Sequence, residues 1–347
     1  MSLHVDIRKT LGDFSLDARF EAGDECLAVL GASGCGKSVT LKCIAGILRP
    51  DEGRIVLDGQ VLFDSAARVD LPPQRRRVGY LFQQYALFPN LTVARNIAAG
   101  VRDPDRREEV TAEKLRQFRL ENVAALRPGQ LSGGQQQRTA LARILASEPR
   151  AILLDEPLSA LDSYLKYQLE LELQDTLSRF PGTALWVTHD RGEAWRSCRR
   201  VCVLDRGRSE PVVTMEELFR APGTESAARL SGCKNYASAV PEGDSVRIPA
   251  WGVTLRCGRP VPGDIVTVGI RSHHVRIAGD EAQNRIPCAV TRVVDDVFGV
   301  IVLLRPEEAA PDAPPLRMEL SKEDWAAQNR PDRLCVRIAQ QDILLLK

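Results

Sequence analysis

The 347-residue chain carries a formal net charge of +1 and contains 44% hydrophobic residues. This length suits about two domains with a buried core, and the near-neutral charge argues against a nucleic-acid partner. No apolar stretch approaches the roughly 20 residues that span a bilayer, and no signal-peptide pattern begins the chain. The nine cysteines form no C-x-x-C pairs, which favours a reducing cytosol and argues against disulfides and a zinc site.

Three predicted strands open the chain, at about residues 3–8, 14–20 and 25–30. The third runs directly into a segment that fits the pattern G-x-x-x-x-G-K-S/T, and the apolar residues after it continue as a helix. A strand, a tight loop and a helix N-terminus form a phosphate-binding loop. Its residues are Gly31, Ala32, Ser33, Gly34, Cys35, Gly36, Lys37 and Ser38.

Each fixed position of this phosphate loop has a chemical role. The glycines let backbone N–H groups turn inward around a β-phosphate. Lys37 places a positive charge on the β- and γ-phosphates, and the Ser38 hydroxyl is a ligand for Mg²⁺. The segment therefore predicts a nucleoside triphosphate site, and the alternative is a Gly/Ser-rich turn that matches the pattern by chance.

Residues 85–145 are predicted to form a mostly helical insertion. Its first residues, 85–93, are unusually apolar for a connection, and Thr92 is placed to cap a helix. The run Arg75–Arg77 precedes it, and we interpret this run as a solvated rim. Near the end of the insertion a serine and two glycines open a helix and form a second N-terminal anion cradle. This signature segment is Leu131, Ser132, Gly133, Gly134 and Gln135.

An unbroken apolar strand, residues 151–154, ends in Asp155 and Glu156. Buried parallel strands deliver polar groups at their carboxyl ends, beside a phosphate loop. Asp155 is then placed to hold Mg²⁺, usually through water, and Glu156 to polarise the water that attacks the γ-phosphate. Taken alone, the segment also fits a strand that merely ends in a charged turn.

The phosphate loop, the LSGGQ segment and the acidic strand together resemble the ATP-binding subunits of ABC transporters, over residues 1 to about 235. One chain has no obvious use for two cradles on one triphosphate unless the second serves a partner's nucleotide. The resemblance implies a catalytic set of Glu156, His189 and Gln83, with Gln83 as a further Mg²⁺ ligand and His189 as the switch histidine. It also implies a D-loop formed by Ser159, Ala160, Leu161 and Asp162.

The family usually stacks the adenine base on an aromatic residue between the first two strands. Residues 9–13 of this chain contain no aromatic residue. Phe14 is a candidate, but its alternation with Leu16 favours a core position. The sequence therefore leaves the adenine contact unassigned.

The pattern changes after about residue 208. Residues 214–219 predict a capped helix, which Pro222 and Gly223 break. From about Tyr236, short strand-like segments alternate with turn residues and predict a small β-barrel. This region resembles the TOBE-type domain of importer ATPases, and residues 268–276 resemble the recurrent strand of that domain. We interpret His273 and His274 as surface polar residues rather than metal ligands.

The predicted fold class is therefore α/β: a P-loop NTPase core of the ABC ATPase type at residues 1–235, followed by a small all-β, TOBE-like or OB-like barrel at residues 236–347. The resemblance implies an ATPase subunit of an importer that uses ATP and Mg²⁺ and lies peripherally on the cytoplasmic side of the cell membrane. Two copies are expected to sandwich two ATP molecules. The other expected partners are an integral-membrane permease and, indirectly, an extracytoplasmic solute-binding protein.

The transported substrate depends on weaker signals. The short first hairpin, the compact segment 64–73 and the junction 232–235 look most like those of molybdate or sulfate importers. Sulfate or thiosulfate, sugar, polyamine and iron importers share the same architecture and remain alternatives. A non-transport ABC ATPase is disfavoured, because such proteins commonly carry two cassettes or a long coiled-coil insertion and this sequence shows neither. A purely regulatory nucleotide-binding module is also disfavoured, because it has no need for the complete set of turnover residues present here.

Overall fold

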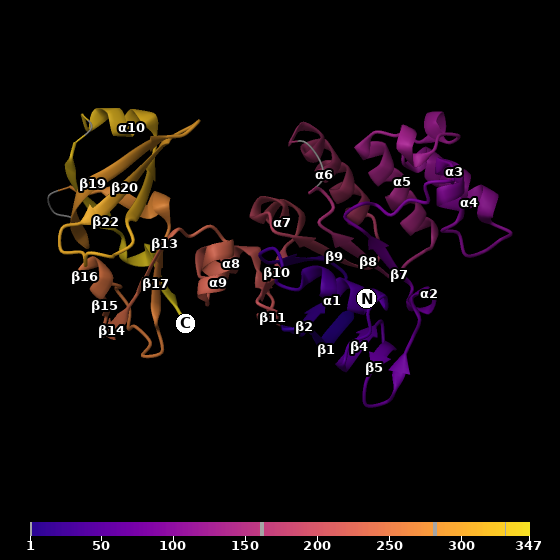
Figure 1. The fold of residues 1–347 in the computed structure, drawn as a ribbon, viewed down its shortest axis with the longest axis horizontal. Helices are drawn as coiled ribbons and strands as arrows, with labels where there is room; N and C mark the ends of the chain where they lie inside the picture. The colour runs from indigo at the N-terminus through magenta and orange to yellow at the C-terminus, as the bar shows by residue number, and fades with distance from the viewer. Residues whose placement is uncertain (1, 160–162, 280–282, 330) are drawn as a thin grey trace. The chain divides into compact units, whose positions relative to one another are not determined.

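The computed structural model describes residues 2–159, 163–279, 283–329 and 331–347. The chain forms two compact units, residues 1–215 and 216–347 (Figure 1). This division lies about twenty residues before the predicted domain boundary at residue 236. Among the described residues, no helix combines the length and the apolar character needed to cross a membrane.

The first unit is an α/β structure. Its strands are β1 (Leu3–Leu11), β2 (Phe14–Ala22), β3 (Cys26–Leu30), β4 (Glu52–Leu57), β5 (Gln60–Asp64), β6 (Val69–Asp70), β7 (Val78–Leu81), β8 (Ala151–Asp155), β9 (Thr183–Thr188), β10 (Arg200–Asp205), β11 (Arg208–Ser209) and β12 (Val213–Thr214). Its helices are α1 (Lys37–Ala45), α2 (Pro73–Arg76), α3 (Val93–Ala98), α4 (Arg107–Gln117), α5 (Gly133–Ala146), α6 (Ser163–Ser178) and α7 (Arg191–Ser197).

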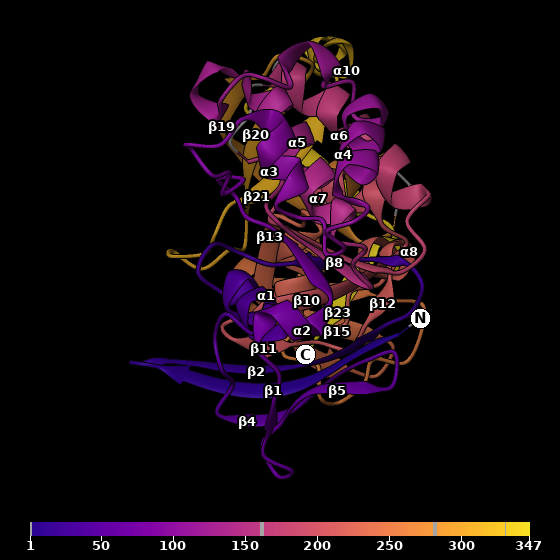
Figure 2. The same cartoon turned by 90° about the vertical axis from the view of Figure 1, so that its right-hand side faces the viewer.

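The described strands of this unit form one twelve-stranded sheet in the order β6-β5-β4-β1-β2-β11-β10-β3-β9-β8-β7, with β12 beside β10. Strands β10, β3, β9, β8 and β7 pair in parallel. Strands β2, β1, β4, β5 and β6 pair antiparallel, and Figure 2 shows β1, β2 and β4 side by side. Every residue of β8 and β9 is buried, as expected for parallel strands covered on both faces. The carboxyl ends of parallel strands meet at one edge, where the phosphate loop follows β3, Gln83 follows β7, Glu156 follows β8 and His189 follows β9.

The first hairpin is tighter than the sequence predicted. Strands β1 and β2 extend to a pairing of Leu11 with Phe14, so only Gly12 and Asp13 form the turn. Gly12 has φ 58°, which suits a two-residue hairpin turn. The stretch interpreted as a loop, residues 9–13, is therefore mostly strand.

The interpretation of Arg75–Arg77 as a solvated rim is wrong for Arg76, which is completely buried. Its guanidinium group donates hydrogen bonds to the carbonyl oxygens of Cys43 and Ile44 at 2.8 and 3.0 Å, and to Asp70 at 2.8 Å. The two carbonyls belong to the last turn of α1, where a cation is favoured by the helix dipole. Arg76 therefore holds the end of the helix that begins at the phosphate loop.

The second unit is an all-β structure with a few short helices, which confirms the predicted fold class. Its elements, beginning at the boundary, are α8 (Met215–Arg220), α9 (Glu225–Leu230), β13 (Asn235–Ser238), β14 (Val240–Glu242), β15 (Ser245–Ile248), β16 (Val253–Arg256), β17 (Thr267–Ile270), β18 (Val275–Ile277), β19 (Arg285–Asp295), β20 (Val300–Pro306), β21 (Leu316–Leu320), α10 (Lys322–Ala327), β22 (Arg333–Ile338) and β23 (Ile343–Leu346). The strands form sheets β13-β17-β23, β14-β15-β16 and β18-β22-β19-β20-β21 around a core that contains the fully buried Trp251.

Residues 268–276 do not form the single strand that the sequence predicted. Strand β17 ends at Ile270, a 3-10 turn covers Ser272–His274, and β18 follows. Arg271 lies at this break with its guanidinium group buried, and it donates hydrogen bonds to the carbonyl oxygens of Ser231 and Phe219. Arg271 therefore fixes the segment that contains α8 and α9 against the β structure. Among the described residues, no cluster of three or more ligating side chains could hold a metal ion, so His273 and His274 belong to none.

Candidate nucleotide-binding and hydrolysis site

The phosphate loop connects β3 to α1, as predicted. Gly34 and Gly36 have φ 80° and 108°, conformations that favour glycine. A Cβ atom on Gly36 would also press against the side chains of Phe14 and Leu16. Burial raises the pKa of the Cys35 thiol, whose residue is only 5% exposed. Cys35 therefore contributes its backbone, and not its side chain, to the loop surface.

Lys37 is the first residue of α1 and lies within the loop. Its Nζ atom donates hydrogen bonds to the carbonyl oxygens of Gly31 and Ala32, both at 2.9 Å. The same atom lies 3.6 Å from Oε1 of Glu156. The structure thus brings the predicted phosphate-binding cation and the predicted catalytic carboxylate together.

Ser38 and Asp155, the two residues predicted to bind Mg²⁺ beside the phosphate loop, lie in direct contact. The Ser38 hydroxyl donates a hydrogen bond to Oδ1 of Asp155 at 2.8 Å, and the Tyr80 hydroxyl donates one to Oδ2 at 2.7 Å. Hydroxyl and carboxylate oxygens are ligands that Mg²⁺ prefers, so these residues fit the ion. The buried Tyr80 keeps its proton because burial and the bond to Asp155 raise its pKa far above the usual value.

Glu156 follows β8 in a left-handed backbone conformation, with φ 47°. Its amide donates to the carbonyl oxygen of Val187 in β9, which ties this turn to the neighbouring strand. Its second carboxylate oxygen lies 3.3 Å from Nδ1 of His189. The carboxylate therefore lies between Lys37 on one side and His189 on the other.

Gln83 is linked to Glu156 through Ser159, the first residue of the predicted D-loop. Its side-chain amide donates a hydrogen bond to Oγ of Ser159 at 3.1 Å, and that hydroxyl donates to the carbonyl oxygen of Glu156 at 3.0 Å. The bond uses the nitrogen of Gln83, which leaves its oxygen available as a metal ligand. The other predicted D-loop residues, Ala160, Leu161 and Asp162, lie outside the described residues.

The segment that follows His189 is held by a charged network. Lys166 of α6 contacts Asp190 at 2.8 Å and Glu193 at 2.7 Å, and Glu193 also accepts a hydrogen bond from Thr188. Burial opposes the charge on Lys166, but its hydrogen bonds to both carboxylates outweigh this effect and raise its pKa. Asp190 in turn caps α7 by accepting bonds from two backbone amides. The network fixes both sides of the predicted switch histidine.

The signature segment opens α5 with a reciprocal cap. The Ser132 hydroxyl accepts a bond from the amide of Gln135, and the Gln135 side chain accepts one from the amide of Ser132. The amides of Gly133 and Gly134 belong to the first turn and have no partners within the helix. Ser132 is exposed, whereas the preceding Leu131 is buried and anchors the segment.

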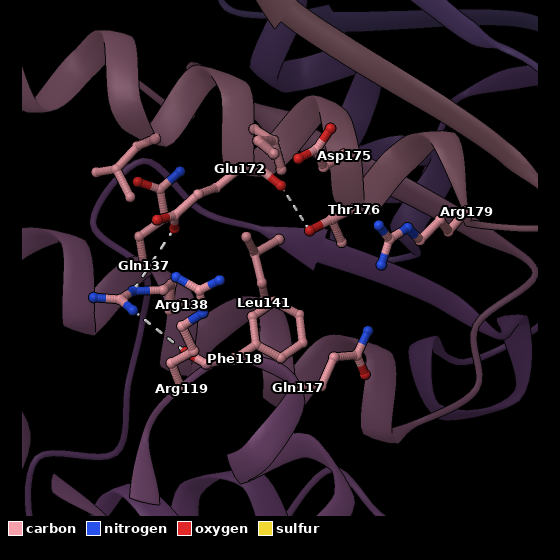
Figure 3. Close-up of a pocket in the computed structure, with 12 residues that line it drawn as sticks. Gln117, Phe118, Arg119, Gln137, Arg138, Leu141, Glu172, Asp175, Thr176 and Arg179 are labelled. Atoms are coloured by element: carbon pink, nitrogen blue, oxygen red, sulfur yellow. Dashed lines mark hydrogen bonds and ion pairs between the residues drawn. The ribbon is translucent and has the colours of Figure 1, made fainter. Parts of the chain in front are cut away.

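Helix α5 is fixed to its neighbours at the edge of a pocket of about 240 Å³ (Figure 3). Arg138 of α5 donates a hydrogen bond to the carbonyl oxygen of Phe118, directly after α4, and pairs with Glu172 of α6 at 3.8 Å. The pocket contains none of the predicted catalytic residues. Its role in the site is indirect, because Arg138 positions the helix that carries the signature segment.

A second cavity, of about 780 Å³, adjoins the first half of the phosphate loop. Phe14 lines it together with Ala32, Ser33 and Gly34, and Arg206 lies on its wall. Phe14 also packs partly against the core, as its alternation with Leu16 indicated. Phe14, the aromatic candidate for the adenine contact, therefore packs against the core and also lines this cavity.

Sequence reasoning missed several residues that position the site, namely Tyr80, Lys166, Glu193 and Arg138. Each acts on a residue from a different element, so no local motif marks it. The one available signal was for Tyr80, a polar aromatic side chain in a short apolar run three residues before Gln83.

Comparison with known proteins places this geometry in a family. Residues 15–159 match the sequence profile of the family described as ABC transporter. The spermidine/putrescine import ATP-binding protein PotA of Methylococcus capsulatus is 40% identical over 270 residues, which cover 75% of this chain and 68% of that protein. The molybdenum import ATP-binding protein ModC of Paramagnetospirillum magneticum is 36% identical over 318 residues, 87% of each chain.

A solved structure agrees with these relatives. The dimeric post-hydrolysis structure of the ATP-binding cassette MJ0796, bound to ADP and Pi, has a TM-score of 0.51 and 30% identity, and the match covers 62% of this chain and 99% of that chain. The chain therefore belongs to the ABC transporter family. It is an ATPase of the importer type, and the predicted ABC ATPase fold is confirmed. The profile match ends at residue 159, so the TOBE-like character of the second unit stays a prediction.

Proposed function

We propose that the chain powers the import of molybdate. The main support is that the relative named for molybdenum import aligns over 87% of both chains, which includes much of the second unit. Sulfate or thiosulfate import is the second candidate, because a relative named for it is 37% identical over 85% of this chain, and polyamine import is the third, with a relative that is 40% identical over 75% of this chain. The short hairpin between β1 and β2 favours molybdate or sulfate import over polyamine import.

The catalytic form in this proposal is a dimer that sandwiches two ATP molecules. Each phosphate loop holds one triphosphate, and the exposed start of α5 in the other copy offers the Ser132 hydroxyl and the first-turn amides to its γ-phosphate. The solved cassette with 30% identity is described as dimeric, which supports this arrangement.

Within each site, the residues divide the work. Ser38, Asp155 and Gln83 would hold Mg²⁺, which neutralises charge on the β- and γ-phosphates when it is bound. Glu156 orients and polarises the attacking water, and His189 lies beside it to contact the γ-phosphate. Lys37 keeps the loop closed on the phosphates through its bonds to Gly31 and Ala32.

The partner that moves solute is a permease, and the chain lies peripherally on the cytoplasmic side of the membrane. The segment 85–93 supports this docking role, because Phe88 is 49% exposed although the residues around it are fixed. Asn96 bonds both the amide and the carbonyl of Phe88, and Arg143 lies 5.2 Å from the centre of its ring. A rigid, exposed aromatic ring suits a receiving surface for a helix. A solute-binding protein would deliver molybdate to the permease.

Uptake in cells tests this function. The chain is expressed with a molybdate permease and its solute-binding protein in cells that lack their own molybdate importer, and cellular molybdenum is measured by mass spectrometry, with Lys37→Ala as the inactive control. We expect molybdenum accumulation that tungstate suppresses and that sulfate and spermidine leave unchanged. Accumulation of spermidine, sulfate or iron without molybdenum would overturn the proposal that molybdate is the substrate, while the assignment as an importer ATPase would stand.

A further inference from the structure

Two cysteine side chains from distant parts of the first unit lie in contact. The Sγ atoms of Cys26 and Cys198 are 3.3 Å apart, although 172 positions separate them in the chain. Cys26 begins β3, the strand that leads into the phosphate loop, and Cys198 ends α7, the helix after His189. This distance is short enough that a disulfide needs only a small approach of the two sulfur atoms.

One of the two cysteines lines a cavity. Cys26 is half-buried and lines a cavity of about 670 Å³, whereas Cys198 is buried. The same cavity is lined by Arg179 and Arg199, whose guanidinium groups have no ion pair within the described part of the chain. Three other charged residues line this cavity: Asp24, Glu25 and Arg196. Glu25 pairs with Arg200, and Arg196 pairs with Glu170.

The environment also distinguishes the two sulfurs chemically. The hydrogen bond to Cys26 and burial raise the pKa of the Cys198 thiol well above its usual value. Cys198 is therefore the more protected thiol, and Cys26, which lines the cavity, is the cysteine that an incoming disulfide meets first. A thiol that reacts at an accessible position next to a second, protected thiol is the arrangement of an attacking and a resolving cysteine.

We propose that Cys26 and Cys198 form an oxidisable dithiol site, which accepts a small disulfide that carries carboxylates, such as glutathione disulfide. The Cys26 thiolate attacks one sulfur of the incoming disulfide, whose S–S bond breaks and releases one glutathione thiolate. Cys198 then loses its proton to solvent, attacks Sγ of Cys26 and displaces the second glutathione. Two protein thiols are oxidised, and one disulfide is reduced to two thiols.

Charge selects the oxidant at this site. Each glutathione moiety carries two carboxylates, and the basic residues Arg179 and Arg199 line this cavity, Arg179 at its border with the pocket of Figure 3. The product ties the end of α7 to the start of β3 and closes a loop of about 170 residues. A cross-link over a loop of this length restricts the unfolded chain strongly, so the oxidised protein is expected to melt at a higher temperature.

Intact mass spectrometry of the reduced full-length protein with glutathione disulfide tests the site. We expect loss of two hydrogens per chain and a mapped bond between Cys26 and Cys198. Cys198→Ser should instead retain one glutathione on Cys26, and Cys26→Ser should show neither product. The matched control is Cys335→Ser, which removes another half-exposed cysteine and should behave as the parent chain does.

A second comparison tests the recognition of charge. Arg179→Gln combined with Arg199→Gln should slow the reaction with glutathione disulfide by about tenfold at low salt, while the rate with the neutral bis(2-hydroxyethyl) disulfide stays within about twofold. The dithiol site would be refuted if the folded parent chain stays reduced under conditions that oxidise the unfolded chain, or if the bond maps to other cysteines. Equal slowing with both disulfides would refute recognition by the arginines.

Discussion

Glu156 shows how much of the site depends on one residue. Its backbone adopts φ 47°, a conformation that costs a non-glycine residue about 1 kcal/mol or more and that the surrounding structure must enforce. Two hydrogen bonds of the Glu156 backbone supply that constraint: its N–H donates to the carbonyl oxygen of Val187, and its carbonyl oxygen accepts from the Ser159 hydroxyl. The result is a carboxylate held within 4 Å of both Lys37 and His189.

The first prediction is that Glu156→Gln keeps ATP binding and loses most hydrolysis. The amide has nearly the same shape as the carboxylate, but it cannot polarise the attacking water, so a fall in kcat of at least about 100-fold is expected. ATP affinity and phosphate release are measured on the same preparation. Turnover near that of the parent chain would remove Glu156 from the catalytic role.

The second prediction concerns Arg76. Arg76→Ala leaves the carbonyl oxygens of Cys43 and Ile44 without their donor and Asp70 without its ion pair, so we expect a loss of about 2–4 kcal/mol in the free energy of unfolding. Urea denaturation measures it. Arg75→Ala is the matched control, because its side chain is exposed and its effect should stay within about 0.5 kcal/mol. Equal effects of the two variants would contradict the capping role.

These residues show where sequence reasoning reached its limit. Lys37, Ser38, Asp155 and Glu156 were predictable because each has a fixed place relative to a strand end, and the geometry of parallel strands brings such ends together. Arg76 was not, because a run of three arginines normally lies in solvent and only the tertiary structure shows that one of them points inward. A local pattern carries no information about a partner more than thirty residues away.

At the scale of elements, α5 carries the signature segment and is fixed on two sides. Its N-terminus is capped by Ser132, and Arg138 ties it to the end of α4 and to α6. The segment that presents Ser132 is therefore well ordered without a nucleotide contact from its own chain. The proposed dimer supplies such a contact from the second copy.

The third prediction tests this sharing. Chains with Ser132→Arg and chains with Lys37→Ala are each expected to be inactive alone, whereas their heterodimers contain one site with both motifs intact and should recover about half of the parent activity per dimer. The control mixes Lys37→Ala with Glu156→Gln, because these changes inactivate both sites of a heterodimer. Inactivity of the first mixture, with heterodimers demonstrated by two affinity tags, would mean that both motifs serve one chain's nucleotide.

The hairpin of β1 and β2 leads to the fourth prediction. Its two-residue turn contains no aromatic residue, so about 1 kcal/mol of stacking should be missing from base recognition. We expect dissociation constants for ATP and GTP within about fivefold of each other, measured by calorimetry with Glu156→Gln to prevent turnover. A strong preference for ATP that Phe14→Leu abolishes would show instead that Phe14 stacks on the base from the cavity beside the loop.

At the scale of the whole molecule, the sequence predicted the order and class of both units because their periodicities differ. Helices and parallel strands dominate the first unit, and short strands separated by turns dominate the second. The position of α8 and α9 was harder to predict, since a capped helix before a change of pattern fits either unit. The deciding contacts are long-range: Arg271 bonds the carbonyls of Phe219 and Ser231, and Ala228 packs with Leu344 and Leu346.

These contacts lead to the fifth prediction, on two shortened chains. A chain of residues 1–215 keeps every predicted catalytic residue and the pairing of β12 with β10, so its basal ATP hydrolysis should stay within about threefold of the full chain. A chain of residues 1–235 also keeps α8 and α9 but loses their partners Arg271, Leu344 and Leu346. The apolar side of α9 is then exposed, and light scattering should detect aggregation at a lower temperature than for residues 1–215. Loss of hydrolysis by a folded 1–215 chain would mean that the second unit supports catalysis, and equal solubility of the two chains would place α8 and α9 with the first unit.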